Sequence, residues 1–149
     1  MTLPQREGIK VRIKHLDDID EVRELWDEFQ AAHHNEDKWP GDDHTYWVLM
    51  EGEHPVGLTS AVFRPEKGYV YLSYAIIMPE RKTKGLQRRL IQHRLRWAKR
   101  QGAIYAVTYT LLHNYPSIMN LLRCGFRFAE TPRGWCGYGT DVHYFEKQL

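Results

Sequence analysis

Cysteine is scarce in this sequence: only Cys124 and Cys136 occur among its 149 residues. They form neither a CxxC pair nor a disulfide framework, so we expect a protein of the reducing cytoplasm rather than a disulfide-bonded secreted one. No run of eighteen apolar residues is present, so no transmembrane helix is predicted. The first ten residues, MTLPQREGIK, also lack the apolar core of a secretory signal.

Familiar phosphate and metal motifs are missing too. The sequence contains neither the GxxxxGK(S/T) of P-loop proteins nor the GxGxxG of dinucleotide-binding folds. Histidines and aspartates gather at His33, His34, Asp42, Asp43 and His44, but their spacing matches no zinc pattern, so we predict no metal site. Neither cysteine has an evident set of partners for nucleophilic catalysis.

The residues that are present are sufficient for one globular domain. Hydrophobic residues make up 42% of the chain and charged residues 27%, proportions typical of a domain with its own core. We therefore expect a single domain over residues 1–149, with residues 1–8 as a flexible N-terminus. The sequence contains no internal repeat and no low-complexity linker.

Charge is unevenly distributed, although the net charge is only +2. Residues 81–100 contain nine basic residues and no acidic one, whereas residues 17–53 contain thirteen acidic residues and only two basic ones. Such asymmetry suggests two ligand surfaces of opposite charge. Helix faces that are charged simply because they are exposed to water would give the same pattern, so charge alone does not distinguish ligand surfaces from exposed helices.

The most informative stretch covers residues 69–101. Its first part, YVYLSYAIIM, is typical of a buried strand, which Pro79 ends. A basic loop containing Gly85 leads to a helical apolar pattern that Arg94 interrupts and Gly102 ends. The unpaired N–H groups of a helix start, surrounded by basic side chains, form a site for phosphate or pyrophosphate. An ordinary strand–helix connection is the alternative.

The remaining segments alternate between strand and helix patterns. Helices are predicted at residues 19–32, after an Asp17-Asp18 cap, and at residues 116–124. Short turns between the early strands imply an antiparallel meander, whereas a helical crossover implies that the strand at 103–110 runs parallel to the strand at 69–78. The other predicted strands cover residues 9–15, 46–51, 56–64, 125–130 and 142–147.

Two motifs make the sequence resemble the GNAT superfamily of N-acetyltransferases. Residues 77–79, Ile-Met-Pro, match the V-x-P end of that family's fourth strand. Residues 82–87 match its Q/R-x-x-G-x-G/A loop, with a lysine and a glutamine in place of the usual first and last residues. Asn114 precedes the Gly-Phe pair at 125–126 at the family's spacing. The resemblance covers about residues 9–147.

The resemblance implies a fold: α/β of the α+β type, in a single GNAT-like domain. The sheet would be mixed and mostly antiparallel, with a V-shaped splay between the fourth and fifth strands and helices on both faces. The fourth strand would then end beside unpaired main-chain groups, against which the pantetheine arm of coenzyme A could lie like an added strand.

The resemblance also implies an activity. A GNAT enzyme binds acetyl-CoA and lets a primary amine attack the thioester directly in a ternary complex, without a covalent enzyme intermediate. The helix start would bind the pyrophosphate, and a main-chain N–H at the strand end would polarise the thioester. The implied acetyl-CoA residues are Ile76, Ile77 and Met78 at the strand end, Arg81, Lys82, Lys84, Gly85, Leu86, Gln87 and Arg88 at the loop and helix start, and Asn114 and Ser117 beside the pantetheine arm.

The general acid is where the sequence departs from the family. Many GNAT enzymes place a tyrosine seven residues after the asparagine, beside the CoA sulfur, but this position is Leu121. Tyr115, His113 or Cys124 could supply the proton instead, or water could, because a thiolate is already a tolerable leaving group. A packing aromatic is the alternative reading of Tyr115.

The general base is also open. The fourth-strand pattern contains no carboxylate, which some relatives use. Tyr71 and Ser73 point to the same side of a period-two strand and could relay a proton through water. His44 and His113 stand nearest the predicted strand ends, and a neutral histidine titrates near working pH. An exposed or structurally bonded histidine is the alternative for both.

The acceptor groove of GNAT proteins is bordered by the first helix region and by the loop between the last strands, which correspond here to residues 33–44 and 131–140. Carboxylates in the first segment would attract a cationic amine, and aromatic rings in both could stack on it. The candidate acceptor residues are Trp39, Asp42, Asp43, Trp135 and Tyr138, with Asp37 as a further carboxylate.

Two other functions fit the sequence. A GNAT-like module that binds CoA or a protein partner without turnover would explain the missing tyrosine. A nucleic-acid-associated protein would use the basic residues 81–100 for phosphate contacts, and salt-dependent retention on DNA would identify it. The expected partner is a small-molecule or protein amine, no membrane partner is expected, and a homodimer would be usual for such a fold.

Overall fold

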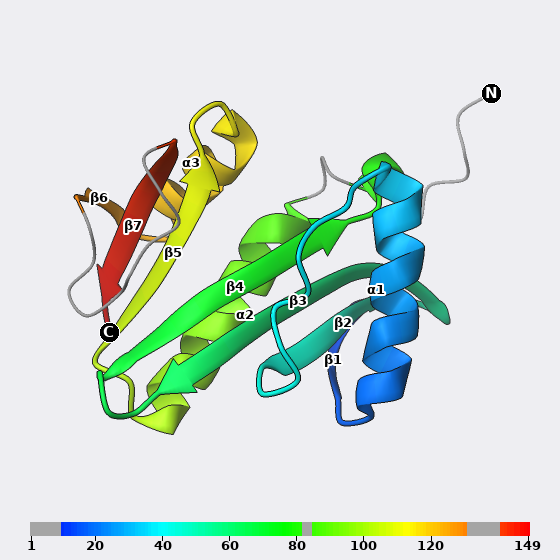
Figure 1. Ribbon diagram of the computed structural model, residues 1–149, viewed down its shortest axis with the longest axis horizontal. Helices are drawn as coiled ribbons and strands as arrows, with labels where there is room; N and C mark the ends of the chain where they lie inside the picture. Colours follow the sequence, from blue (N-terminus) through cyan, green and yellow to red (C-terminus); the bar gives the residue numbers. More distant parts are fainter. Residues whose placement is uncertain (1–9, 82–84, 131–140) are drawn as a thin grey trace.

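The computed structural model describes residues 10–81, 85–130 and 141–149, so the expected flexible N-terminus lies outside it. The described residues form one seven-stranded sheet with helices on both sides (Figure 1). Its elements are β1 (Val11–Leu16), α1 (Ile19–His33), β2 (Thr45–Glu51), β3 (His54–Arg64), β4 (Tyr69–Ile77), the 3-10 helix η1 (Pro79–Arg81), α2 (Leu86–Gln101), β5 (Tyr105–Leu111), α3 (Tyr115–Arg123), β6 (Arg127–Ala129) and β7 (Val142–Gln148).

The sheet has the strand order β1-β2-β3-β4-β5-β7-β6. Its first four strands form an antiparallel meander, and β4 pairs with β5 in parallel, as the sequence predicts. The last strand, β7, is antiparallel to both β5 and β6 and lies between them. The predicted final strand pair is therefore confirmed, and β7 joins it to the rest of the sheet.

The parallel pairing of β4 with β5 is short. Only residues 69–71 of β4 pair with residues 105–107 of β5, although both strands continue further. Figure 1 shows the two strands diverging beyond this point. The last link is the Thr108 hydroxyl, which donates to the carbonyl oxygen of Leu72 at 2.8 Å. The predicted V-shaped splay between the fourth and fifth strands is confirmed.

Helices cover both faces of this sheet (Figure 1). Helix α1 begins after Asp18, whose side chain accepts the Asp20 N–H and so caps the helix, as predicted. None of the helices in the described ranges is long and apolar enough to cross a membrane. The core on the α1 side includes Val22, Trp26, Phe29, Leu58 and Ile76, and the core on the α2 side includes Val70, Leu72, Ile91, Leu95 and Ala98.

A β-bulge in β4 decides which residues face which helix. Opposite β3, Ser60 pairs with Tyr74 and Ala61 pairs with Leu72, so Ser73 is the extra residue. Leu72 packs on the α2 side, whereas Tyr74 packs on the α1 side, although strict alternation would place both on one face. The bulge thereby turns Ser73 and Tyr74 together toward the α1 side.

Candidate active site

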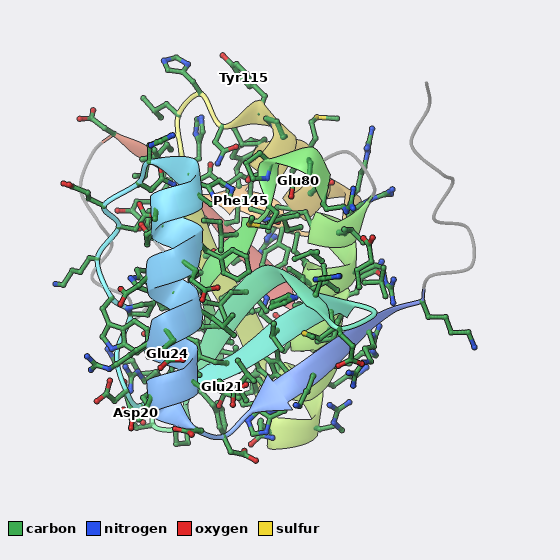
Figure 2. The ribbon with its side chains drawn as sticks, turned by 90° about the vertical axis from the view of Figure 1, so that its right-hand side faces the viewer. Asp20, Glu21, Glu24, Glu80, Tyr115 and Phe145 are labelled. Carbon is green, nitrogen blue, oxygen red and sulfur yellow. The ribbon has the colours of Figure 1, made fainter. Side chains whose placement is uncertain are left out.

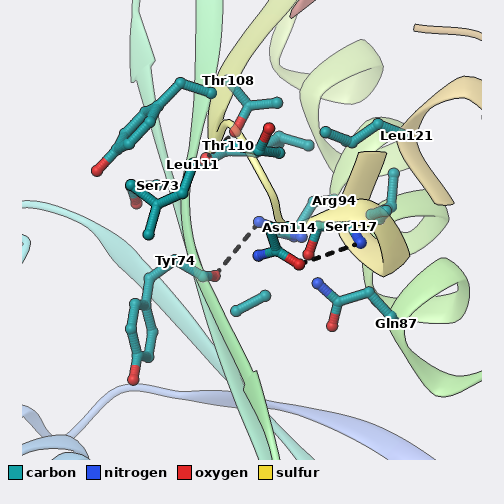
Figure 3. A pocket seen from close by; sticks show the side chains of 14 residues that line it. Ser73, Tyr74, Gln87, Arg94, Thr108, Thr110, Leu111, Asn114, Ser117 and Leu121 are labelled. Carbon is teal, nitrogen blue, oxygen red and sulfur yellow. Dashed lines mark hydrogen bonds between the residues drawn. The ribbon is translucent and has the colours of Figure 1, made fainter. Parts of the chain in front are cut away.

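Two cavities lie on the two sides of β4 and meet at the bulge. The smaller, of about 190 Å³, is lined by β4, β5, α2 and α3, and Figure 3 shows its side chains. The larger, of about 460 Å³, is lined by the segment after α1 together with β4 and β5. Ser73, Tyr74 and Tyr109 line both cavities. Ser73 can therefore contact a molecule in either cavity.

The smaller cavity brings several of the predicted cofactor residues together. Gln87, from the first turn of α2, lines it, as do Asn114 and Ser117 at the start of α3. Asn114 is the N-cap of α3, and its side-chain oxygen accepts the Ser117 N–H at 3.4 Å. Leu121, at the family's tyrosine position, lines the same cavity. Four residues from two helices thus face one space between the splayed strands.

The β4 residues that line this cavity are 72–75, which precede the predicted set Ile76, Ile77 and Met78. The side chains of Ile76 and Ile77 are 7% and 3% exposed and belong to the cores around the strand end. The carbonyl oxygen of Ile77 lies 2.7 Å from Nε2 of His33 in α1. Contacts between a cofactor and this strand end would therefore come from the main chain, as the resemblance implies.

The start of α2 has the features of an anion site. Gly85 is its N-cap with a φ of +69°, which favours glycine, and no side chain of the described residues caps the first N–H groups. The first turn contains no acidic residue, and the Arg88 guanidinium lies 3.6 Å from where a side chain at position 85 would begin. Leu86 is buried. Lys82 and Lys84 lie outside the described residues.

Arg81 has a partner within the fold. It is 9% exposed, and its Nε atom lies 2.9 Å from Oε2 of Glu51 at the end of β2. Its terminal nitrogen donates to Oε1 of the same carboxylate at 3.2 Å. This ion pair connects η1 to β2, so the charge that the resemblance assigns to a phosphate is already paired inside the protein.

Two side chains of the larger cavity, those of His44 and Ser73, belong to a hydrogen-bonded chain that ends at the buried Ser60. Nδ1 of His44 lies 2.7 Å from Oγ of Ser73, which lies 2.7 Å from Oγ of Ser60. The His44 side chain is 5% exposed, and burial lowers the pKa of His44 below its ordinary value of 6.5. A neutral imidazole bonded to a hydroxyl can accept a proton through that hydroxyl.

The three candidates for the general acid, Tyr115, His113 and Cys124, lie outside both cavities. Tyr115 is 63% exposed at the start of α3, and Figure 2 shows it at the surface. Its hydroxyl lies 3.3 Å from Nδ1 of His113, and neither residue lines either cavity. Burial raises the pKa of the Cys124 thiol, which opposes its ionisation. Among the acid–base candidates from the sequence, Ser73 lines both cavities, whereas Tyr71 and His44 line the larger one.

Some of the predicted acceptor residues line the larger cavity, and others hold the lining residues in place. Trp39 lines the cavity together with Asp37. Asp42 accepts a hydrogen bond from the Trp39 ring nitrogen at 2.9 Å and pairs with Arg23 of α1 at 2.7 Å. These two donors hold the pKa of Asp42 below its usual range. Asp42 thus anchors Trp39 rather than lining the cavity itself.

Asp43 is also paired, since its Oδ2 atom lies 3.0 Å from NH1 of Arg64 in β3. The two aspartates therefore fix the segment that leads into β2 and carries His44. Trp135 and Tyr138, the remaining acceptor candidates, lie outside the described residues. Within the described ranges, no three His, Cys, Asp or Glu side chains gather into a group that could hold a metal ion.

Arg94 and Thr110 also line the smaller cavity, although neither is among the sequence candidates. Arg94 of α2 is 3% exposed, and its only sequence signal is its position on the apolar side of the helix. Thr110 of β5 has a buried hydroxyl that finds no hydrogen-bond partner in the described part of the chain. Nothing in the β-branched run at 103–110 distinguishes it from Thr108.

Comparison with known proteins identifies a family with this arrangement. A family model described as the acetyltransferase (GNAT) family matches residues 14–126. No curated protein sequence matches the chain.

Solved structures share the fold at low sequence identity. The ribosomal-protein-S18-alanine N-acetyltransferase from Escherichia coli has a TM-score of 0.72 at 16% identity, with 94% of both chains covered. A Salmonella typhimurium protein solved with its cofactor acetyl-CoA has a TM-score of 0.69 at 21% identity, with 93% of this chain and 94% of that one covered. An acetyltransferase from Streptococcus agalactiae has a TM-score of 0.72 at 16% identity, with coverages of 93% and 98%.

Proposed function

Because the chain belongs to the acetyltransferase (GNAT) family, we propose that it transfers an acetyl group from acetyl-CoA to a primary amine by direct attack of the amine on the thioester. One observation carries this proposal: the two cavities beside β4 adjoin, since Ser73, Tyr74 and Tyr109 line both of them. Two reactants held in adjoining cavities react as an effectively unimolecular pair. Such a pair needs no covalent enzyme intermediate.

The smaller cavity and the start of α2 would hold acetyl-CoA, whose thioester supplies the reactive acyl carbon. The residues present fit such a ligand, because the start of α2 and the Thr110 hydroxyl, which have no side-chain partner among the described residues, both need acceptor atoms. Arg81 is assigned to the fold through its pairing with Glu51. The proposed binding residues are Gly85, Leu86, Gln87 and Arg88 for the pyrophosphate, with Lys82 and Lys84 from the loop, and Asn114 and Ser117 for the pantetheine arm.

The attacking amine loses a proton as the new C–N bond forms. Ser73 lies at the meeting point of the cavities, and its hydroxyl is bonded to His44. We assign Ser73 as the group that contacts the amine and His44 as the base that accepts the proton through it. The lowered pKa of His44 keeps the imidazole neutral, and so able to accept, at neutral pH.

The larger cavity would receive the acceptor. Trp39 can stack on it, and Asp37 can attract its positive charge before deprotonation. Two similar solved structures are named for amine acceptors, alanine of ribosomal protein S18 in one and spermidine in the other. These names support an amine as the acceptor class for this chain.

Isothermal titration calorimetry with acetyl-CoA tests the cofactor site. We expect the wild type to bind and Gly85→Glu to lose binding, because the positive φ strains any other residue and the new carboxylate repels the phosphates. Gly102→Glu is the matched control, since Gly102 also has a positive φ, of +93°, but lies at the opposite end of α2. A folded wild type that binds neither acetyl-CoA nor CoA would end this proposal, and nucleic acid would be tested next.

A CoA-binding module without turnover is the second candidate function. The observation that favours it is Leu121, which leaves the smaller cavity without a phenol at the family's tyrosine position. A panel of amines separates the two functions through the release of the CoA thiol. Acetylation of any amine above the buffer rate supports the enzyme, whereas binding without turnover across the panel supports the module.

A further inference from the structure

Arg94 is a buried cation that lines the smaller cavity. It is 3% exposed, and its guanidinium donates to three carbonyl oxygens. Nε donates to Leu90 at 3.2 Å, and NH1 donates to Ser60 at 3.2 Å and to Tyr74 at 3.3 Å. No carboxylate in the described part of the chain forms an ion pair with it. These partners are dipoles, so no described residue neutralises its charge.

A guanidinium buried without a counter-ion is costly to a fold. Burial lowers the pKa of Arg94 to about 9, which still leaves it protonated at neutral pH. Its bonds to Ser60 and Tyr74 hold it at the bulge, because these two residues are paired across the strands beside Ser73. A neutral side chain could also donate hydrogen bonds to these carbonyl oxygens, so they do not explain why the residue is charged. An anionic guest of the cavity would give the charge a partner.

Thr110 provides a second, independent observation in this cavity. It is 6% exposed, and its hydroxyl has no hydrogen-bond partner among the described residues. Thr108, two residues earlier on β5, instead donates to Leu72. Buried hydroxyls are normally bonded, so Thr110 leaves a donor for a ligand. Figure 3 shows Arg94 and Thr110 around one cavity, and both need an acceptor atom there.

The chemistry of the proposed reaction places an anion in this cavity. The acyl carbon must lie where the cavities meet, at Ser73, because the amine arrives from the larger one. The sulfur and the rest of the acyl donor then lie in the smaller cavity. When the C–S bond breaks, its electron pair stays on sulfur, so negative charge develops on the Arg94 side of β4.

We propose that Arg94, assisted by Thr110, stabilises the thiolate that leaves the acyl donor, and that it is a catalytic residue of this reaction. This inference rests on the proposed function. The amine nitrogen bonds to the acyl carbon, the C–S bond breaks, the thiolate departs beside the protonated guanidinium, and the amine proton passes to His44 through Ser73. Since the sulfur needs no proton before it leaves, Leu121 is no obstacle to turnover.

The direct test is the pKa of the CoA thiol when CoA is bound to the wild-type protein, followed by the ultraviolet absorbance of the thiolate during a pH titration. We expect a value at least about one unit below that of free CoA, because an adjacent opposite charge lowers the pKa of an acid by about 1–3 units. Arg94→Gln keeps a donor but no charge, so it should return the pKa to that of free CoA. Arg94→Lys should keep part of the shift.

Two threonine variants form a matched pair. Thr110→Val removes a hydroxyl that has no partner in the described ranges, so it should leave the stability unchanged and raise the pKa of the bound thiol. Thr108→Val removes the bond to Leu72, so it should lower the stability and leave the pKa of the bound thiol unchanged. The pair keeps the test decisive even if Arg94→Gln fails to fold.

Three results would overturn the assignment of Arg94. Bound CoA could titrate like free CoA, or the shift could survive Arg94→Gln. The protein could also prefer succinyl-CoA to acetyl-CoA in a way that Arg94→Gln reverses, which would pair the guanidinium with an acyl carboxylate instead. In the first two cases CoA still binds and the proposed acetyl transfer stands, whereas in the third the acyl group of the proposed function changes as well. A folded wild type that does not bind CoA would overturn both the assignment of Arg94 and the proposed acetyl transfer.

Discussion

His44 is the residue on which the proposed proton transfer depends, and several groups set its protonation. The Asp43 carboxylate, 3.8 Å from Nε2, raises the pKa of His44, whereas the Arg64 charge lowers it. The rings of Tyr46 and Tyr71 lie beside the imidazole and help to exclude water from it. Desolvation is the largest effect, so the pKa lies below 6.5 and the neutral form prevails at neutral pH.

The pH dependence of kcat/KM should therefore follow the His44 imidazole. The base must be neutral, so the rate is full above its pKa and falls as pH drops through it, which places the fall below pH 6.5. His44→Gln should lower kcat by about 10²–10⁴-fold and remove this acid limb. The measurement is CoA release with a fixed amine at a series of pH values, corrected for the ionisation of that amine.

His113→Gln is the matched control for this prediction, because His113 is exposed and lines neither cavity. We expect it, and Tyr115→Phe beside it, to keep most of the wild-type rate. A large loss in these two variants together with a normal rate in His44→Gln would place the acid–base groups at the start of α3.

Local patterns in the sequence are enough to predict some site residues but not their charge partners. Asn114 precedes a helix start, and N-capping is a local property, so its placement beside Ser117 is readable from the sequence. Arg81 and Asp42 look equally available in the sequence. Their partners come from distant elements, and only the folded chain reveals that both charges are already paired.

At the scale of elements, the strand at 69–78 and the helix that follows were predictable because a proline and two glycines mark their ends. The bulge at Ser73 was not. The run YVYLSYAIIM is apolar on both faces of the strand, so its hydrophobic pattern does not reveal a bulge that shifts the alternation by one residue. The position of β7 between β5 and β6 is likewise set by pairing between distant segments, which no local pattern encodes.

The link between η1 and β2 gives a prediction at this scale. Arg81 and Glu51 have side chains 11% and 7% exposed, and they join η1 to the end of β2. Arg81→Met should lower the free energy of unfolding by about 3–5 kcal/mol, because the carboxylate loses its guanidinium while it stays buried. The affinity of the folded protein for acetyl-CoA should not change. Urea denaturation and calorimetry measure the two quantities.

The double variant Arg81→Met/Glu51→Leu is the control, since it removes both charges together and should recover much of the lost stability. The opposite pattern, a weaker affinity for acetyl-CoA with unchanged stability in Arg81→Met, would show that Arg81 serves the cofactor phosphates.

The whole molecule consists of two parts of one sheet that meet along a short seam, namely residues 69–71 of β4 paired with residues 105–107 of β5. Strands β1–β4 lie on one side of this seam, and β5, β7 and β6 lie on the other. The smaller cavity opens just beyond the seam and is lined from both parts. A ligand that fills this cavity therefore adds contacts between the two parts at the place where β4 and β5 no longer pair.

Binding of acetyl-CoA should accordingly slow amide hydrogen exchange on both sides of the seam. We expect amide hydrogen exchange to slow at residues 72–75 of β4, at residues 108–111 of β5 and in the first turn of α3, with little change in β1 and β6. At a ligand concentration of about 100 times Kd, the free energy of unfolding should rise by about 2.7 kcal/mol. Mass spectrometry of exchange and urea denaturation measure these effects, and Gly85→Glu should show neither.

Protection confined to the start of α2 would mean that the phosphates bind while the thioester does not reach Ser73. Cofactor binding would then be separate from the proposed site of acetyl transfer.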